Sequence, residues 1–359
     1  MKKKIVMVMY GMGVGGAELQ FLELAQFLNK KYDLQIYGFA NRGPLEADFI
    51  NSGLNIRVID YKSKLGLIKA TIIFLKDIYI NTPETIVSTS IIGNIVTYIA
   101  KKLFSIKKII SFQTIAKCMM KKCVIDQFIL KRFDLLIAGS NAIKEYLDIH
   151  LENKSNTVII HNWSDFSNLK VSKPINEILE QYNINATDFN IGCIARLHKQ
   201  KGQKYLIQAM HYIIQKNIKV YFIGNGPEYK YLFELVEKYK LQDRIFFLGE
   251  QRNDYINLMS VFDVIVFPSL YEGLPRTLLD AMYMKKCILA TNIDGINEVI
   301  EDSKNGLLVE AENPSELKEA IEYLATNVEK RNHFSSIAHY DVIDKFEMIG
   351  QLEKIDKYL

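Results

Sequence analysis

Two carboxylates frame a turn in the stretch FPSLYEGLPRTLLDAM, residues 267–282. The stretch leaves an apolar run at Val264–Phe267 and enters a helical pattern with Pro275 at or near its first position, which proline favours. Backbone N–H groups at a helix start bind anions, helped by the helix dipole. Glu272 precedes this helix and Asp280 lies about two turns into it, so at ~1.5 Å rise per residue they are on the order of 10 Å apart. This spacing suits a sugar at one end, a ribose at the other and phosphates between them.

A pair of cations lies in a second stretch of the same half, GCIARLHKQKGQKYLIQAM, residues 192–210. Arg196 and Lys201 follow an apolar run and precede a helical pattern. This stretch resembles the strand, Gly-Arg-Leu and Lys-Gly pattern of the retaining glycosyltransferases of family 4, which use such an Arg/Lys pair on the donor diphosphate. When the sugar–phosphate bond breaks, charge grows on the leaving diphosphate, and fixed cations stabilise that transition state more than the ground state. A metal ion is then unnecessary, and the sequence has no D-x-D-like motif in a suitable loop to hold one.

A glycine-rich loop near the amino end has two interpretations. Gly11, Gly13 and Gly16 follow the apolar run Ile5–Tyr10 with the G-x-G-x-x-G spacing of dinucleotide-binding loops. Such loops need a carboxylate at the end of the second strand, about 20 residues further on. The sequence has residues 38–41 there, without a carboxylate, although Arg42 could bind the 2′-phosphate of NADP.

The other interpretation gives the weight to Gly15 and Gly16, which are followed by Ala17 and Glu18. This order resembles the Gly-Gly pair followed by Ala-Glu in the first loop of the same glycosyltransferase family. The resemblance implies that missing side chains let the backbone approach donor phosphates or the transferred sugar, and that N–H groups of the following helix start donate to them.

The elements that must position these residues follow one rhythm. Short β-branched runs alternate with amphipathic segments, which is typical of parallel sheets wrapped by helices, so the predicted class is α/β. Strands are expected near residues 5–9, 34–39, 55–59, 85–88, 108–111, 135–138, 157–160, 189–194, 220–223, 244–248, 264–267, 288–290 and 307–309.

The rhythm stops once, in a polar segment that contains Pro174. We therefore predict two tandem Rossmann-like domains, residues 1–165 and 189–340, joined by a linker at 166–188, with a final helix at 341–359 that packs back toward the first domain. Ligands bind at the carboxyl ends of the strands in open α/β sheets. The candidate residues follow strands in both halves.

Composition narrows the class of function. The formal net charge of +4 is too small to indicate nucleic acid as the principal partner. The apolar run at Ile5–Tyr10 is short for a signal peptide, and the most apolar helical window, Ile68–Ile80, is too short for a bilayer span of about 20 residues. Neither a disulfide framework nor a zinc site is suggested by the four scattered cysteines, Cys118, Cys123, Cys193 and Cys287. A reducing cytoplasm fits best.

The pattern E-G-L-P-x-x-x-x-D resembles the E-x7-E signature of the retaining glycosyltransferases of family 4, also called group 1, whose fold is the two-domain GT-B type. Asp280 stands where this family usually has its second glutamate. The resemblance implies that Glu272, Arg196 and Lys201 are catalytic, with the Arg/Lys pair on the donor diphosphate, and that Asp280 contacts the ribose.

Further stretches carry the same resemblance, which covers about residues 190–325 well and the first half thinly. The stretch FIGNGPEY, residues 222–229, resembles a tight loop on the nucleotide side, and Arg252 falls near the base. The donor-binding residues implied are Gly15, Gly16, Gly224, Asn225, Gly226, Arg252, Gly273, Leu274, Pro275 and Asp280.

Gln113 occupies the acceptor side, where this family often has a histidine. Glutamine hydrogen-bonds a sugar hydroxyl but does not accept a proton at neutral pH, so no side chain is assigned as general base. The resemblance implies a front-face displacement, in which the leaving phosphate oxygen takes the proton of the acceptor and the anomeric configuration is retained.

Nine basic residues lie between positions 101 and 132, interleaved with apolar ones, and Asp126 is the one acidic residue among them. This pattern is typical of a surface that rests on anionic lipid, and equally of a solvated helix face. The cations are Lys101, Lys102, Lys107, Lys108, Lys117, Lys121, Lys122, Lys131 and Arg132.

Together these observations predict a cytoplasmic, metal-independent, retaining glycosyltransferase without a cofactor. Its donor is a nucleotide diphosphate sugar, with UDP-sugars favoured, and its acceptor is a saccharide or lipid-linked saccharide of bacterial surface polysaccharide synthesis. Three alternatives stay open: a sugar-nucleotide epimerase of the same fold, an NADP-dependent oxidoreductase, and a non-catalytic binding protein.

Overall fold

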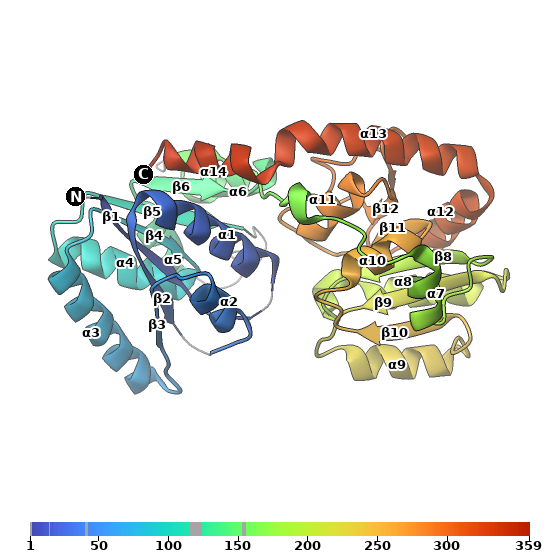
Figure 1. The fold of residues 1–359 in the computed structure, drawn as a ribbon, viewed down its shortest axis with the longest axis horizontal. Helices are drawn as coiled ribbons and strands as arrows, with labels where there is room; N and C mark the ends of the chain where they lie inside the picture. Colours follow the sequence, from blue (N-terminus) through green and yellow to red (C-terminus); the bar gives the residue numbers. More distant parts are fainter. Residues whose placement is uncertain (1, 14, 40–41, 115–123, 153–155) are drawn as a thin grey trace. The chain divides into compact units, whose positions relative to one another are not determined.

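The computed structural model describes residues 2–13, 15–39, 42–114, 124–152 and 156–359, with side chains at 124–126 left undescribed. The chain divides into two compact units, shown in Figure 1. Unit 1 comprises Met1–Asn162 and Ile349–Leu359, and unit 2 comprises Trp163–Met348. The boundary thus falls three residues before the expected end of the first domain, and the expected linker 166–188 is part of unit 2.

Unit 1 is built on a seven-stranded sheet whose strands all run parallel, in the order β3-β2-β1-β4-β5-β6-β7. Strand β1 pairs with β2 on one side, Ile5 opposite Leu34, and with β4 on the other, Ile5 opposite Thr85. The strands are β1 (Lys4–Met9), β2 (Asp33–Phe39), β3 (Ile56–Ile59), β4 (Thr85–Thr89), β5 (Lys108–Gln113), β6 (Leu135–Ala138) and β7 (Thr157–Ile159).

The apolar run that was compared with a signal peptide forms β1, an inner strand of this sheet. Residues 5–9 of β1 are all buried, because a parallel strand covered on both faces needs apolar side chains on both. Helices connect the strands: α1 (Gly16–Lys31), α2 (Leu45–Asn51), α3 (Lys64–Asn81), α4 (Ile91–Leu103), α5 (Val124–Leu130) and α6 (Asn141–His150). Serine hydroxyls cap three of them by accepting from backbone N–H groups, at Ser63, Ser90 and Ser140.

Unit 2 is built on a six-stranded parallel sheet in the order β10-β9-β8-β11-β12-β13. Its strands are β8 (Phe189–Ile194), β9 (Ile218–Ile223), β10 (Ile245–Gly249), β11 (Val264–Phe267), β12 (Cys287–Thr291) and β13 (Leu307–Val309). Its helices are η1 (Phe166–Asn168), α7 (Ile175–Gln181), η2 (Lys199–Lys201), α8 (Gln203–Tyr212), α9 (Tyr229–Lys238), α10 (Tyr255–Val261), α11 (Arg276–Tyr283), α12 (Pro314–Thr326) and α13 (Val328–Phe346).

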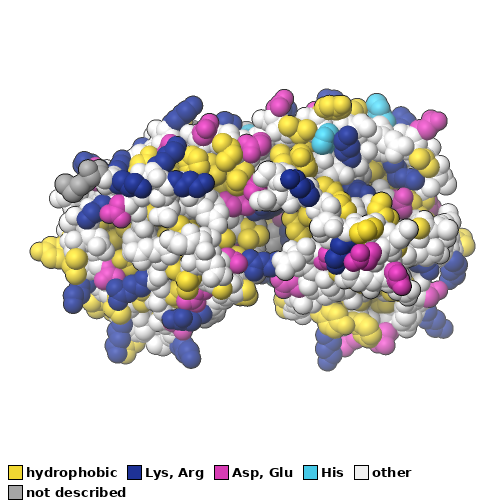
Figure 2. Space-filling model, in the orientation of Figure 1, with side chains coloured by type: hydrophobic (Ala, Val, Ile, Leu, Met, Phe, Trp, Pro, Cys, Tyr) yellow, Lys and Arg dark blue, Asp and Glu magenta, His cyan; other side chains and the backbone are white. Residues whose placement is uncertain are grey.

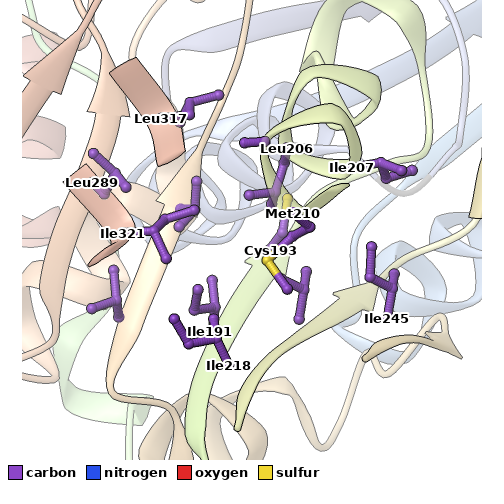
Figure 3. Packing of buried hydrophobic residues seen from close by; sticks show 14 of the residues in the cluster. Ile191, Cys193, Leu206, Ile207, Met210, Ile218, Ile245, Leu289, Leu317 and Ile321 are labelled. Atoms are coloured by element: carbon purple, nitrogen blue, oxygen red, sulfur yellow. The ribbon is translucent and has the colours of Figure 1, made fainter. Parts of the chain in front are cut away.

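One face of this second sheet packs on helices α8 and α12. Figure 3 shows Ile191 and Cys193 of β8 with Met210 of α8 and Ile321 of α12, and all four are at most 1% exposed. This core sets the position at which β8 ends, and the loop after β8 carries Arg196 and Lys201.

The expected final segment 341–359 is divided between the units. Helix α13 continues to Phe346 within unit 2, whereas α14 (Met348–Asp356) belongs almost entirely to unit 1. The Asp356 carboxylate lies 2.7 Å from the Lys31 ammonium and accepts from the Tyr32 hydroxyl at 2.8 Å. Figure 1 shows both chain ends in unit 1, where the Lys3 ammonium donates to the Leu359 carbonyl.

All thirteen expected strands are present, with bounds that shift by at most two residues, so the predicted α/β class is confirmed. In each sheet the strand order reverses once, between β1 and β4 in unit 1 and between β8 and β11 in unit 2. Ligands of open parallel sheets bind at the carboxyl ends of the strands on either side of such a reversal. Among the described helices, none is both long and apolar enough to cross a membrane.

Candidate functional site

The reversal point of unit 2 brings together two residues that lie 71 positions apart in sequence. Lys201 follows β8, Glu272 follows β11, and the Lys201 ammonium lies 2.5 Å from a Glu272 carboxylate oxygen. The Glu272 side chain is 7% exposed and that of Lys201 is 23% exposed, so the pair is shielded but reachable. Because β8 and β11 are adjacent in the sheet, their carboxyl-terminal loops have to meet here.

Gly202 allows these two loops to touch. Its φ is +63°, and a Cβ atom at this position would lie 1.9 Å from the carbonyl oxygen of Pro268. Only glycine fits such a close approach with a left-handed backbone. The glycine that the sequence pattern places before α8 therefore has a packing role that holds Lys201 next to the acidic loop.

Ser269 positions the Glu272 carboxylate and was not identified from the sequence. Its hydroxyl donates to Glu272 Oε1 at 2.8 Å, and Ser269 is 2% exposed. The Thr291 hydroxyl, at the end of β12, donates to the Ser269 carbonyl at 2.6 Å and fixes the loop from behind. Serine between a proline and a glutamate carries no distinctive sequence signal, so the contact becomes visible only when the loop is folded.

We expect replacement of Ser269 by alanine to lower the turnover number of the reaction at this site about tenfold while changing the substrate KM less, because a charge-assisted hydrogen bond contributes roughly 1.5–3 kcal/mol. Steady-state kinetics of the purified variant measures both constants. Ser260→Ala is the matched control, since the Ser260 hydroxyl donates to the Asn257 carbonyl at 2.6 Å outside the site. An equal loss in both variants would assign Ser269 a stabilising role alone.

Asp280, for which the resemblance implies a contact with the ribose, is buried within unit 2. It is 1% exposed, and its carboxylate accepts hydrogen bonds from the Ser164 hydroxyl and, at 3.2 Å, from the Tyr255 hydroxyl. Burial raises the pKa of this carboxyl, and the nearby charge of Arg276 partly offsets that increase. Residues 278–282 of α11 are all buried, so this part of the helix is enclosed on every side and Asp280 lies in the core. The structure gives this carboxylate two internal donors.

The other predicted donor residues of unit 2 lie on neighbouring loops. Gly224, Asn225 and Gly226 follow β9, and the Leu197 N–H donates to the Asn225 carbonyl at 3.0 Å, which ties this loop to the one that carries Arg196. Arg196 is exposed. In the acidic loop, Gly273 and Leu274 are buried and lead to Pro275, the residue before the first helical residue of α11. Arg252 lies in the turn after β10.

In unit 1, the glycine loop follows β1 at the reversal point of the first sheet. Gly15 is the N-cap residue of α1, and the Glu18 carboxylate lies against it: a Cβ atom at Gly15 would be 2.3 Å from Glu18 Oε2. Gly16 begins the helix and is exposed. Arg42, which the sequence analysis considered as a ligand of the 2′-phosphate of NADP, pairs with Glu46 at 2.9 Å.

Gln113 ends β5 and is 7% exposed. Its side-chain amide donates to the Ser111 hydroxyl at 2.7 Å, and that hydroxyl donates to the Asn94 side chain at 2.7 Å. The predicted acceptor-side residue is thus part of an internal polar network below the surface. Ser90, at the end of β4, was not identified from the sequence and has φ +74° and ψ 157°, a region that is costly for residues other than glycine.

Three of the six basic residues that the structure describes in the segment 101–132 pair with carboxylates. Lys101 pairs with Asp134 at 2.5 Å, Lys107 with Glu84 at 2.6 Å and Lys131 with Glu152 at 3.3 Å, so the opposite charges come from outside the segment. Figure 2 shows basic and acidic side chains interspersed on the visible face of unit 1. Lys117, Lys121 and Lys122 lie outside the described residues, as do Cys118 and Cys123.

No group of three or more His, Cys, Asp or Glu side chains that could hold a metal ion occurs within the described parts of the chain. Cys193 and Cys287 are both buried free thiols, and burial raises the pKa of each to about 12. They belong to the core of unit 2.

The chain is similar to known proteins in sequence. Residues 174–341 match the family model of the group 1 glycosyl transferases. An uncharacterized glycosyltransferase of Methanocaldococcus jannaschii is 34% identical over 200 residues, which are 55% of this chain and 51% of that protein. The UDP-Gal:alpha-D-GlcNAc-diphosphoundecaprenol alpha-1,3-galactosyltransferase of Escherichia coli is 28% identical over 186 residues, 49% of this chain and 46% of that protein. The chain spans about half the length of these curated relatives.

The fold matches a solved structure over its whole length. HepE of Anabaena, solved in complex with UDP-glucose, superposes with a TM-score of 0.89 and 22% identity, covering 99% of this chain and 98% of the other. The two parallel-sheet units therefore have the GT-B fold that the resemblance predicted.

Proposed function

We propose that this chain, whose residues 174–341 match the family model of the group 1 glycosyl transferases, moves a sugar from a nucleotide diphosphate sugar to a saccharide acceptor. The observation that carries the proposal is the Lys201–Glu272 pair, held at the reversal point of the sheet in unit 2 beside the loop of Arg196. A cation and a carboxylate from two adjacent strand ends serve two ends of one ligand, the diphosphate and the sugar.

The step we assign is a retaining displacement. The bond between the anomeric carbon and the phosphate oxygen breaks, and a bond from the anomeric carbon to the acceptor oxygen forms on the same face. The acceptor proton passes to the leaving phosphate oxygen, so no side-chain base is required. Arg196 and Lys201 stabilise the charge that grows on the diphosphate, and Glu272 orients the sugar and Lys201. No residue in this scheme requires a metal ion.

A UDP-sugar is the donor we favour, and a saccharide on a lipid carrier is the acceptor. HepE, which shares the fold, was solved with UDP-glucose, and the name of the Escherichia coli relative gives UDP-Gal as donor and a diphosphoundecaprenol saccharide as acceptor. The lipid-linked acceptor in the name of the Escherichia coli relative supports the proposal that this chain acts in bacterial surface polysaccharide synthesis. The ion pairs of the basic segment give peripheral membrane contact less support than its sequence did.

Calorimetric titration with UDP, GDP and NADPH, each with a chelator, tests this proposal. We expect one nucleoside diphosphate to bind without metal, and Arg196→Ala to weaken it about tenfold to a hundredfold, because a charge-assisted contact to phosphate is lost. Arg42→Ala is the matched control, since Arg42 is equally basic and pairs with Glu46 in unit 1. Binding of NADPH alone, with loss in Arg42→Ala, would favour the oxidoreductase instead.

A sugar-nucleotide epimerase would use the same site, so only the reaction product distinguishes it from a transferase. A transferase consumes the donor in proportion to a glycosylated acceptor, whereas an epimerase releases an isomerised sugar in the absence of any acceptor. Analysis of the sugar released from UDP-glucose with and without saccharide decides between them.

A further inference from the structure

A pocket of about 590 Å³ lies within unit 2 and is lined in part by His198, Lys199 and Gly202 of the loop that carries Lys201. Its volume is in the range of small-molecule sites. The walls come from four segments: the loop after β8 with the first turn of α8, the start of α9, Leu270 after β11 and Glu312 after β13. None of the residues assigned above to catalysis or donor binding lines it.

Two tyrosines provide aromatic surface. Tyr205 is 8% exposed and forms part of the inner wall, and the Lys204 ammonium lies 4.5 Å from the centre of its ring. Tyr231 of α9 is 46% exposed and lies at the rim. Aromatic rings combine a flat apolar face with a polar hydroxyl, which suits a ligand that is itself apolar on one face and polar at its edge.

The charged groups of the pocket balance one another. Lys199 and Lys204 supply two cations, and Glu228 and Glu312 supply two carboxylates. His198 adds an uncharged donor: burial and the neighbouring Arg196 lower its pKa, and its Nδ1 accepts from the Gln200 N–H at 3.2 Å, which leaves the proton on Nε2. The pocket therefore offers both donors and acceptors without a net charge.

Glu312, which lines this pocket, has an uncommon backbone conformation. Its φ is +63°, which costs a residue with a side chain on the order of 1 kcal/mol, and its carboxylate accepts a hydrogen bond from the Tyr205 hydroxyl. The sequence offers asparagine one position later, at Asn313, a residue that tolerates this region better. The Glu312 carboxylate is therefore a fixed polar group of the pocket wall, held by its hydrogen bond with Tyr205.

We infer that this pocket binds a neutral hexopyranose unit, and that in the working enzyme this unit belongs to the acceptor saccharide; the second clause rests on the proposed function. An anion would meet Glu228 and Glu312, and a cation would meet Lys199 and Lys204. A sugar ring matches the site because each hydroxyl both donates and accepts, while its C–H face packs on a tyrosine. Binding here would hold a distant sugar unit of the acceptor while another unit reacts.

Saturation-transfer NMR with the full chain and the methyl α-glycosides of glucose, galactose and N-acetylglucosamine tests the inference. We expect at least one glycoside to bind, and Tyr231→Ala to weaken it roughly fivefold to tenfold through loss of ring contact. Glu312→Asn, which keeps a residue suited to positive φ, should weaken it as well. Tyr340→Ala, which removes a tyrosine that is 74% exposed on α13 of the same unit, should leave binding unchanged.

The experiment separates this site from the donor site. Arg196→Ala should weaken UDP binding about tenfold to a hundredfold but keep glycoside binding if the pocket is independent. Failure of all three glycosides to bind, binding that survives both pocket variants, or binding of inorganic phosphate in their place would overturn the inference. The proposed transferase would stand in each of these cases, provided that UDP still binds.

Discussion

Replacing Glu272 with glutamine is expected to lower the rate of sugar transfer about a thousandfold, with little effect on stability. Glutamine keeps the size of the side chain and its hydrogen bond from Ser269, but it removes the charge that lies 2.5 Å from the Lys201 ammonium. Loss of one preorganised electrostatic contact in a shielded site costs roughly 10²–10³ in turnover, and here the orientation of Lys201 is lost together with the contact to the sugar. Transfer from the nucleotide sugar identified by calorimetry measures the effect.

Glu301→Gln is the matched control for this variant. Its carboxylate lies 2.6 Å from the Lys304 ammonium, close to the distance in the site, but its side chain is 68% exposed. An exposed pair of this kind contributes at most about 1 kcal/mol, so both transfer and thermal stability should stay unchanged. Turnover of Glu272→Gln at the rate of the unmodified protein would remove Glu272 from the mechanism.

Replacing Gly295 with alanine is expected to destabilise unit 2 by roughly 2–4 kcal/mol and to reduce transfer at the same time. Gly295 has φ +83°, and a Cβ atom there would lie 1.6 Å from the Gly273 carbonyl oxygen and 3.1 Å from that of Glu272. Both neighbours are backbone atoms, so the chain cannot accommodate the methyl group by rotating a side chain. The acidic loop must move, and Glu272 moves with it.

Gly249→Ala separates backbone strain from this collision. Gly249 also has a positive φ, +71°, yet no atom lies within 4 Å of a Cβ built on it. Its replacement should cost about 1 kcal/mol and leave transfer intact. Chemical denaturation of the two variants compares their free energies of unfolding. Equal values would mean that the contact with Gly273 carries no weight.

The class of fold and the positions of the loops that carry the candidate site residues follow from the amino-acid sequence alone. Apolar runs of five or six residues, such as Ile5–Met9, have few alternatives to a strand buried on both faces, and the alternation of such runs with amphipathic segments requires parallel connections. Glu272, Arg196 and Lys201 were placed after strands by the same pattern. Two of them prove to be in contact, because adjacent parallel strands end at one edge of a sheet.

The burial of residues in the polar segment 166–188 and of Asp280 depends on tertiary packing. The polar segment 166–188 reads as a linker by composition, but Phe166 and Ile178 pack into the core of unit 2, because burial depends on what surrounds a residue and not on its neighbours in sequence. The same reason accounts for Asp280, whose charge suggested a ligand and whose place on α11 turns it inward to Ser164 and Tyr255.

Contacts between distant segments are the part that no local pattern contains. Ser269 and Thr291 support Glu272 through hydrogen bonds across two strands, and Tyr205 meets Glu312 from 107 positions away. Spacing along the chain limits which side chains share one helix face or one strand end. Which side chains meet from different elements depends on the packing of the sheet and its helices, and this packing is a property of the whole folded unit.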